Sequence, residues 1–182
     1  MFKDFDIGPF KKMKPPANSG YTTRTEINEL KKIPLKKDFV KKFDNIESAF
    51  AKTAKDNNIK NYDKSVAAKL IKESAPVILK LKKYHNRPRP KDLDKNLPNY
   101  EMASMKTKSY PSGHSVQGFL IGAYLSDKYP RSRKALMATA KNISYSRRVA
   151  RAHYKSDSKM GEELGNSMYK HIKNKNEKES TS

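Results

Sequence analysis

Three short segments carry the residue types that could bind and transfer a phosphoryl group. They are residues 82–90 (KKYHNRPRP), 111–114 (PSGH) and 146–157 (SRRVARAHYKSD). Together they supply cations, the start of a helix, two histidines and a carboxylate. Phosphoryl transfer needs charge stabilisation and alignment of the phosphate oxygens, and a histidine can serve as nucleophile or as acid. The three segments therefore predict a phosphoryl-transfer site.

The PSGH segment predicts an anion site at the beginning of a helix. Pro111 disfavours helix before it, Ser112 can cap the helix, and Gly113 lets the backbone approach a ligand closely. The amide groups of a first helical turn bind anions. His114 follows as a candidate proton donor, because an unperturbed imidazole titrates near physiological pH. Taken alone, such a tetrapeptide usually marks only a turn that enters a helix.

His153 and Asp157 lie four residues apart and so share one face of a helix. A carboxylate that accepts a hydrogen bond from one ring nitrogen fixes the tautomer and leaves the other nitrogen free to attack. The alternative is an exposed ion pair worth about a few tenths of a kcal/mol, and in isolation the pair favours that interpretation.

Arg147 precedes His153 by six residues, which on a continuous helix places the two side chains about 120° apart. They cannot converge on one small ligand in that arrangement. We therefore predict a break within residues 149–152, with His153 in the opening turn of the following helix.

Lys82 and Arg89 complete the predicted set of phosphate-binding cations. Arginine offers a planar fork that matches phosphate oxygens, and lysine acts as a point charge. Two alternatives stay open at this point. Lys80 with Arg87 satisfies the same spacing, and in a chain with 40 Lys and Arg either pair could be ordinary basic surface.

The joint pattern Lys-x6-Arg-Pro, Pro-Ser-Gly-His and Ser-Arg-x5-His-x3-Asp resembles the phosphatidic acid phosphatase type 2 superfamily, which includes vanadium haloperoxidases. It is most similar to the soluble class A bacterial acid phosphatases, whose Arg-x-Arg-Pro favours Lys82 with Arg89. The resemblance implies that His153 is the nucleophile, Asp157 its orienting partner and His114 the acid. It also implies the phosphate ligands, which are Lys82, Arg89, Ser112, Gly113 and Arg147.

The resemblance further implies a metal-independent phosphatase that forms a phosphohistidine and needs no cofactor. Its substrate is expected to be a phosphorylated small molecule, a phosphomonoester or, as an open alternative, a diphosphate. Two rival functions remain. One is a vanadate-dependent haloperoxidase, and the other is a basic nucleic-acid-binding protein that retains the motif without activity.

Composition bounds the size and the partners of the protein. Its 182 residues suit one domain, and its net charge of +21 attracts polyanions, nucleic acid among them. Most of the lysines are spread along the chain and are expected to form a solvated surface. No apolar run reaches the length of a membrane span and no secretory signal is visible, so we expect a cytoplasmic or otherwise soluble protein.

Apolar spacing predicts an all-α helical bundle with the active site at helix ends and connecting loops. Residues 1–23 are expected to be an extended arm that is packed on the body or partly disordered, residues 24–172 the phosphatase-like domain, and residues 173–182 a disordered polar tail. Residues 86–110 are expected to form a long loop. The predicted helices span residues 36–57, 63–84, 112–128, 132–151 and 156–172.

Overall fold

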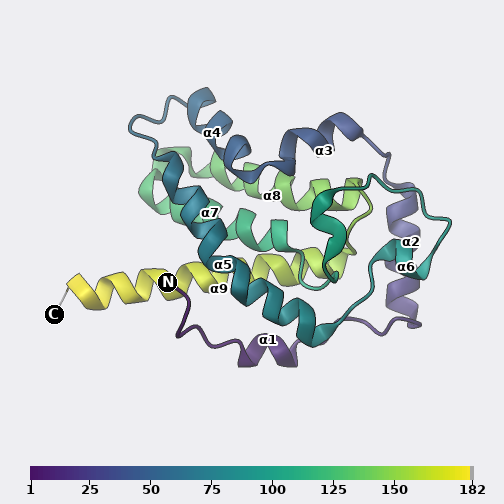
Figure 1. Cartoon of the computed structure of the whole chain (residues 1–182). Helices are drawn as coiled ribbons and strands as arrows, with labels where there is room; N and C mark the ends of the chain where they lie inside the picture. Colours follow the sequence, from purple (N-terminus) through teal and green to yellow (C-terminus); the bar gives the residue numbers. More distant parts are fainter. Residues whose placement is uncertain (181–182) are drawn as a thin grey trace.

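The structure is a computed structural model that describes residues 1–180. These residues form helices joined by loops, with no strand among them, which confirms the predicted all-α class (Figure 1). In chain order the elements are α1 (Gly8–Lys12), α2 (Tyr21–Lys32), α3 (Lys37–Asp44), α4 (Ile46–Asp56), α5 (Lys64–His85), α6 (Pro90–Leu93), the 3-10 helix η1 (Ala103–Lys106), α7 (Gly113–Lys128), the 3-10 helix η2 (Pro130–Ser132), α8 (Arg133–Val149) and α9 (Lys155–Ser180).

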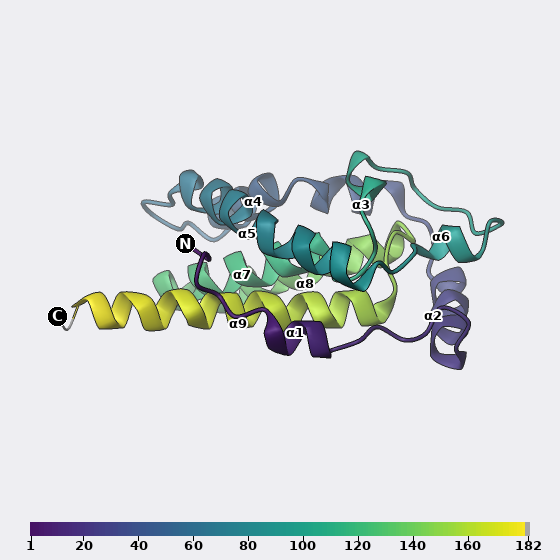
Figure 2. The ribbon, with the colours of Figure 1, turned by 60° about the horizontal axis from the view of Figure 1, so that its bottom comes forward.

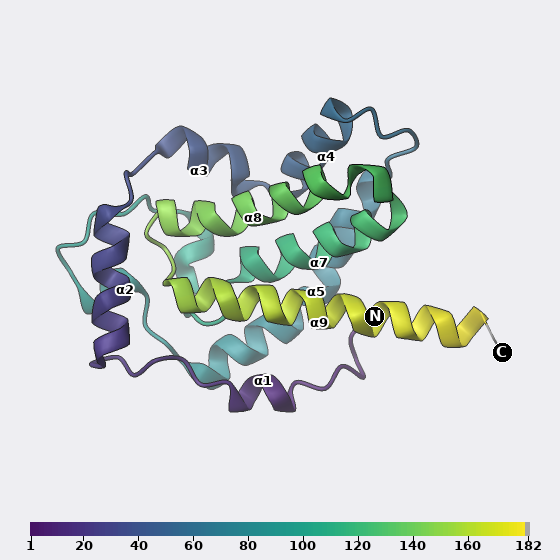
Figure 3. The same cartoon turned by 180° about the vertical axis from the view of Figure 1, so that it is seen from behind.

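Helix α7 lies at the centre of the bundle. It packs most extensively against α8 and α9, which flank it in the view from behind (Figure 3), and it also contacts α5 and α4. Glycines let α9 approach very closely. A Cβ atom at Gly161 would lie 2.6 Å from the Ser115 Cβ, and one at Gly165 would lie 2.4 Å from the Val116 carbonyl oxygen. The start of α9 is thereby fixed against the start of α7.

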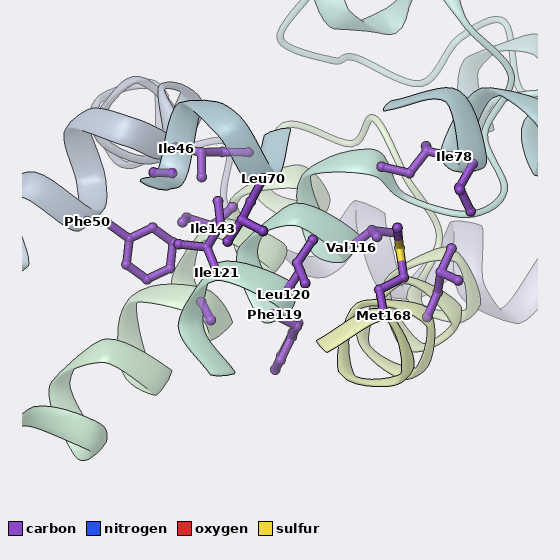
Figure 4. Close-up of a cluster of buried hydrophobic side chains, with 14 of the residues drawn as sticks. Ile46, Phe50, Leu70, Ile78, Val116, Phe119, Leu120, Ile121, Ile143 and Met168 are labelled. Atoms are coloured by element: carbon purple, nitrogen blue, oxygen red, sulfur yellow. The ribbon is translucent and has the colours of Figure 1, made fainter. Parts of the chain in front are cut away.

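The apolar side chains of α4, α5, α7, α8 and α9 form one core (Figure 4). Leu70, Val77, Ile78 and Leu81 of α5 are buried in this core. These positions correspond to i, i+7, i+8 and i+11 of a helix, so a single face of α5 covers the central helix.

The helix predicted over residues 36–57 is in fact two helices. Asn45 adopts an extended conformation between α3 and α4, and its side chain accepts a hydrogen bond of 2.8 Å from the Ser48 amide. Asparagine competes with the helix in this way because its short side chain caps the next helical turn. The break places Asp44, the last residue of α3, at the edge of the predicted site.

The N-terminal residues pack on the body and are not wholly extended. Phe2 and Phe10 are buried in the main core, and α1 begins at Gly8. Figure 2 shows α1 beneath α9 and α2 standing across one end of the bundle, where α5 ends and α9 begins.

The predicted disorder of residues 173–180 is wrong, because α9 continues through them. Lys173 donates to Asp127 of α7 at 2.9 Å, and the exposed turns beyond it project from the body (Figure 1). Polar composition suggested disorder, but these residues extend a helix that the core already anchors. Residues 181–182 of the predicted tail lie outside the described residues.

Within residues 1–180, no helix combines the length needed to cross a bilayer with sufficient apolar character. Helix α7, which holds the most apolar run of the chain, has 16 residues, whereas a span needs about 20.

Candidate active site

The three predicted segments converge at one end of the bundle. The end of α5 brings in residue 82, the loop after it brings residue 89, and α7 begins beside them at residue 113. The junction between α8 and α9 closes the site from the other side (Figure 1). The prediction of a site built at helix ends and loops matches this arrangement.

The predicted break between α8 and α9 is confirmed, but His153 lies two residues before α9 and not in its first turn. Helix α8 ends at Val149, and Arg151 takes a left-handed conformation with φ of 57°. The Arg151 side chain donates to the carbonyl oxygens of Pro98 at 3.0 Å and Ile33 at 3.1 Å. These contacts tie the turn to two neighbouring segments.

His153 is held in one tautomer by its two ring nitrogens. Nδ1 lies 3.1 Å from Oδ2 of Asp157, and Nε2 lies 3.1 Å from NH1 of Arg89. A guanidinium can only donate, so Nε2 accepts and Nδ1 carries the proton. Burial, together with the charges of Arg89 and Lys82, holds the pKa of His153 well below its usual value. The buried ring is therefore neutral, with a lone pair on Nε2.

Asp157 is itself surrounded by donors. It accepts from the Tyr154 amide at 3.0 Å and from the Ser109 hydroxyl, and it pairs with NH1 of Arg87 at 2.7 Å. Burial raises the pKa of Asp157, and the Arg87 guanidinium opposes this shift. The donors stabilise the ionised carboxylate, as a fully buried charge requires.

Lys82 and Arg89 are buried cations that contact the loop before α7. The Lys82 ammonium donates to the carbonyl oxygen of Lys108, while Arg89 donates to those of Thr107 at 2.8 Å and Ser104 at 3.2 Å. Burial and the charge of Arg89 lower the pKa of Lys82 to about 7, and burial lowers that of Arg89 to about 10. An anion placed between these cations would relieve their mutual repulsion.

Arg147 extends from the last turn of α8 toward α3. Its NH1 lies 2.9 Å from Oδ1 of Asp44 and 3.1 Å from the sulfur of Met102. Its NH2 is buried and has no hydrogen-bond partner among the described residues. The buried guanidinium of Arg147 therefore has one nitrogen, NH2, that could still donate to a ligand.

Ser112 and Gly113 begin α7 as predicted. The Ser112 hydroxyl accepts from the Ser115 amide at 3.4 Å, and its own amide donates to the carbonyl oxygen of Asp157 at 3.1 Å. A Cβ atom at Gly113 would lie 3.9 Å from Cε of Lys82. This helix start is therefore joined to the His153 segment and adjacent to the lysine.

His114 contacts Asp44 of α3. Its Nε2 lies 2.9 Å from the carbonyl oxygen of Asp44 and 3.7 Å from that residue's carboxylate. Burial and the charge of Arg147 lower the pKa of His114 to about 4. The ring therefore differs from an unperturbed imidazole, because burial and the cations that would attract phosphate both disfavour its protonated form.

Sequence reasoning missed four residues that complete the site. Arg87 and Ser109 hold Asp157, Glu26 holds Arg87, and Asp44 holds Arg147 and His114. Only Arg87 left a signal, as the alternative register of the Lys-x6-Arg-Pro pattern. In the structure Arg89 reaches the nitrogen of His153 and Arg87 reaches the carboxylate behind it.

Among the described residues, no group of three or more His, Asp or Glu side chains is arranged to hold a metal ion. The predicted site is instead composed mainly of cations. Its predicted cations are Lys82, Arg89 and Arg147. The predicted arginine and histidine side chains pair with the carboxylates of Asp44 and Asp157, and Asp92 accepts from the Arg89 amide.

Comparison with known proteins agrees with this geometry. The family model of the PAP2 superfamily matches residues 66–173, more than half of the chain. A non-specific acid phosphatase of Salmonella typhimurium (strain LT2) is 34% identical over 87 residues, which cover 46% of this chain and 35% of that protein. The match thus spans about a third of the phosphatase's length.

The fold has a counterpart among solved structures. The crystal structure of the first transmembrane PAP2-type phosphatidylglycerolphosphate phosphatase, from Bacillus subtilis, aligns with a TM-score of 0.63 and 18% identity over 98% of both chains. At this identity the likeness shows a shared fold. All three segments singled out from the sequence lie inside the matched range of 66–173.

Proposed function

This chain belongs to the PAP2 superfamily, and we propose that it is a phosphatase that hydrolyses phosphomonoesters through a phosphohistidine on residue 153. The observation that carries the proposal is the state of that ring. Nε2 of His153 accepts from Arg89, and Nδ1 donates to Asp157. A neutral imidazole oriented in this way presents its lone pair at a cluster of cations.

In the first step, Nε2 of His153 attacks phosphorus and the bond from phosphorus to the ester oxygen breaks. His114 donates a proton to the departing oxygen. In the second step a water attacks phosphorus, the phosphorus–nitrogen bond breaks, and His114 takes a proton from the water. Inorganic phosphate then leaves, and His153 is again neutral with its proton on Nδ1.

Lys82, Arg89 and Arg147 would bind the phosphate oxygens, with Ser112 and the amide of Gly113 as further donors. Their positive charges would stabilise the negative charge on the oxygens of the transferred phosphoryl group. We therefore propose that the reaction needs no metal ion. The phosphate would replace the carbonyl oxygens of Thr107 and Ser104 at Arg89.

The bound phosphate also accounts for an acidic role of His114. Burial, together with the charges of Arg147 and Lys82, lowers the pKa of this ring to about 4 when no anion is present. A phosphate dianion next to them cancels part of that positive charge and raises the pKa. His114 would then be protonated when substrate is bound, which is when a proton is needed.

The acid phosphatase relative supports phosphomonoesters as the substrate class, and diphosphates and lipid phosphates present the same group to the site. A panel that includes p-nitrophenyl phosphate, nucleotides, pyrophosphate and a short-chain phosphatidic acid would rank these classes by kcat/KM. We expect vanadate to inhibit competitively, because it mimics five-coordinate phosphorus, and we expect EDTA to have no effect.

The decisive test is His153→Ala. Turnover of the best substrate should fall by at least about a thousandfold, since the covalent route is lost. Acid-labile phosphate should be trapped on the wild-type protein and not on the variant. The matched control is His171→Ala, which removes a partly buried histidine that pairs with Asp4 outside the predicted site; its turnover per folded molecule should equal that of wild type. Retained activity in His153→Ala would refute the nucleophile assignment.

A further inference from the structure

Helix α2 stands across the end of the bundle that holds the site (Figures 2 and 3). It lies outside residues 66–173, the range of the superfamily match. Its one buried acidic residue is Glu26, which is 7% exposed. A carboxylate is rarely buried unless it is paired and hydrogen-bonded, so its partners indicate what it does.

Glu26 contacts both the start of α9 and the loop after α5. Its Oε1 accepts from the Ser156 amide at 2.7 Å, and its Oε2 accepts from the Ser156 hydroxyl at 2.7 Å. Oε2 also accepts from NH2 of Arg87 at 3.3 Å. Ser156, the residue before Asp157, is therefore held by the two hydrogen bonds that it donates to a residue of another helix.

Arg87 links this carboxylate to the one that holds the histidine. Its NH1 pairs with Asp157 at 2.7 Å while its NH2 pairs with Glu26, and its guanidinium carbon lies 3.8 Å from the centre of the Tyr154 ring. The fork is buried, so these contacts are poorly screened. The connection runs from Glu26 through Arg87 and Asp157 to Nδ1 of His153.

We propose that Glu26 is a positioning residue for His153, so that α2 contributes a residue to the active site. This inference rests on the proposed function. Two effects follow from the contacts. Glu26 fixes Arg87 and Ser156, and these two fix Asp157. Glu26 also shares the positive charge of Arg87, which leaves more of the Asp157 charge available to the imidazole as the ring becomes positive during attack.

The test compares Glu26→Gln with Glu29→Gln. Both variants remove one negative charge from α2, but Glu29 is exposed and three residues further along. We expect Glu26→Gln to lower kcat by about tenfold to a hundredfold, as loss of outer partners does at other sites, with KM within about twofold of wild type. Glu29→Gln should match wild type in both constants.

Phosphoenzyme formation and the histidine tautomer separate positioning from mere stability. Rapid-quench measurements should show slower phosphorylation of His153 in Glu26→Gln per folded molecule. ¹⁵N-histidine NMR should show the Nδ1–H form in wild type and a mixture of tautomers in the variant. Equal kcat and an unchanged tautomer in folded Glu26→Gln would overturn the proposal.

Glu26→Asp is the second variant, in case Glu26→Gln does not fold. It keeps the charge near Arg87 but withdraws it from Ser156, so kcat should lie between wild type and the expected value for Glu26→Gln. A wild-type kcat in folded Glu26→Asp would show that the contact of the longer Glu26 side chain with Ser156 does not matter for catalysis, and would overturn that part of the proposal. The NMR comparison needs no turnover, so an inactive wild-type protein would overturn the proposed function and still leave the positioning of His153 measurable.

Discussion

The two histidines of the site are held in contrasting ways. His153 bonds through Nδ1 to a fully buried side chain, Asp157, which three further groups support. His114 bonds to a main-chain carbonyl of Asp44, a residue whose side chain is about half exposed. One ring is fixed from behind through several layers of contacts, and the other lies at an edge with a single partner residue.

This contrast matches the two tasks that the proposed reaction would set. A nucleophile must keep one tautomer and one direction, so a deep and rigid support benefits it. A residue that first gives and then takes a proton must change its charge within each turnover. The pKa of His114, about 4 without a ligand, is set mainly by burial and by nearby cations that phosphate would neutralise.

The largest expected effect comes from Asp157→Asn. The amide would offer its NH2 or its oxygen to Nδ1 and would no longer enforce the Nδ1–H tautomer, so we expect kcat to fall by about a thousandfold to ten-thousandfold. Circular dichroism should confirm that the helices remain, since Arg87 keeps its contact with Glu26. Activity above about a tenth of wild type would show that the deep support of His153 matters little.

A smaller effect is expected from His114→Asn, and it should depend on the leaving group. An alkyl phosphate needs a proton on its departing oxygen, so kcat should fall by about a hundredfold or more. A p-nitrophenolate leaves without help, so with that ester the first step should slow by only about tenfold or less. The rate of the first step is measured by stopped-flow detection of p-nitrophenol release. Equal losses for both esters would contradict the acid role.

The motif residues and the helix that begins at the PSGH segment could be predicted because their signals are local. Ser112 caps α7 within one turn, and the spacing from Arg147 to His153 demanded the break that Arg151 makes. The chain end was misjudged because composition alone does not show that α9 is already anchored when it reaches residue 173.

Glu26 and Asp44 could not be found in the sequence, although both contact side chains at the predicted site. The chain has 19 acidic residues, and no spacing rule distinguishes these two from the rest. Their roles arise only when α2 and α3 dock at the end of the bundle. The split at Asn45, which makes Asp44 the last residue of α3, falls inside the segment that apolar spacing predicted as one helix over residues 36–57.

The mildest change, Asp44→Asn, tests whether the His114 edge is adaptable. The Asp44 carboxylate pairs with Arg147 at 2.9 Å and so competes with phosphate for that guanidinium. Its removal should let inorganic phosphate inhibit at a roughly three- to fivefold lower concentration, because a half-exposed pair is worth only about 1 kcal/mol. The nearby negative charge also raises the pKa of His114, so its loss should lower kcat by a similar factor with alkyl phosphates.

The matched control is Asp38→Asn, which changes an exposed residue of the same helix. If the two variants share one inhibition constant, Asp44 does not compete with phosphate, and the edge is as fixed as the interior.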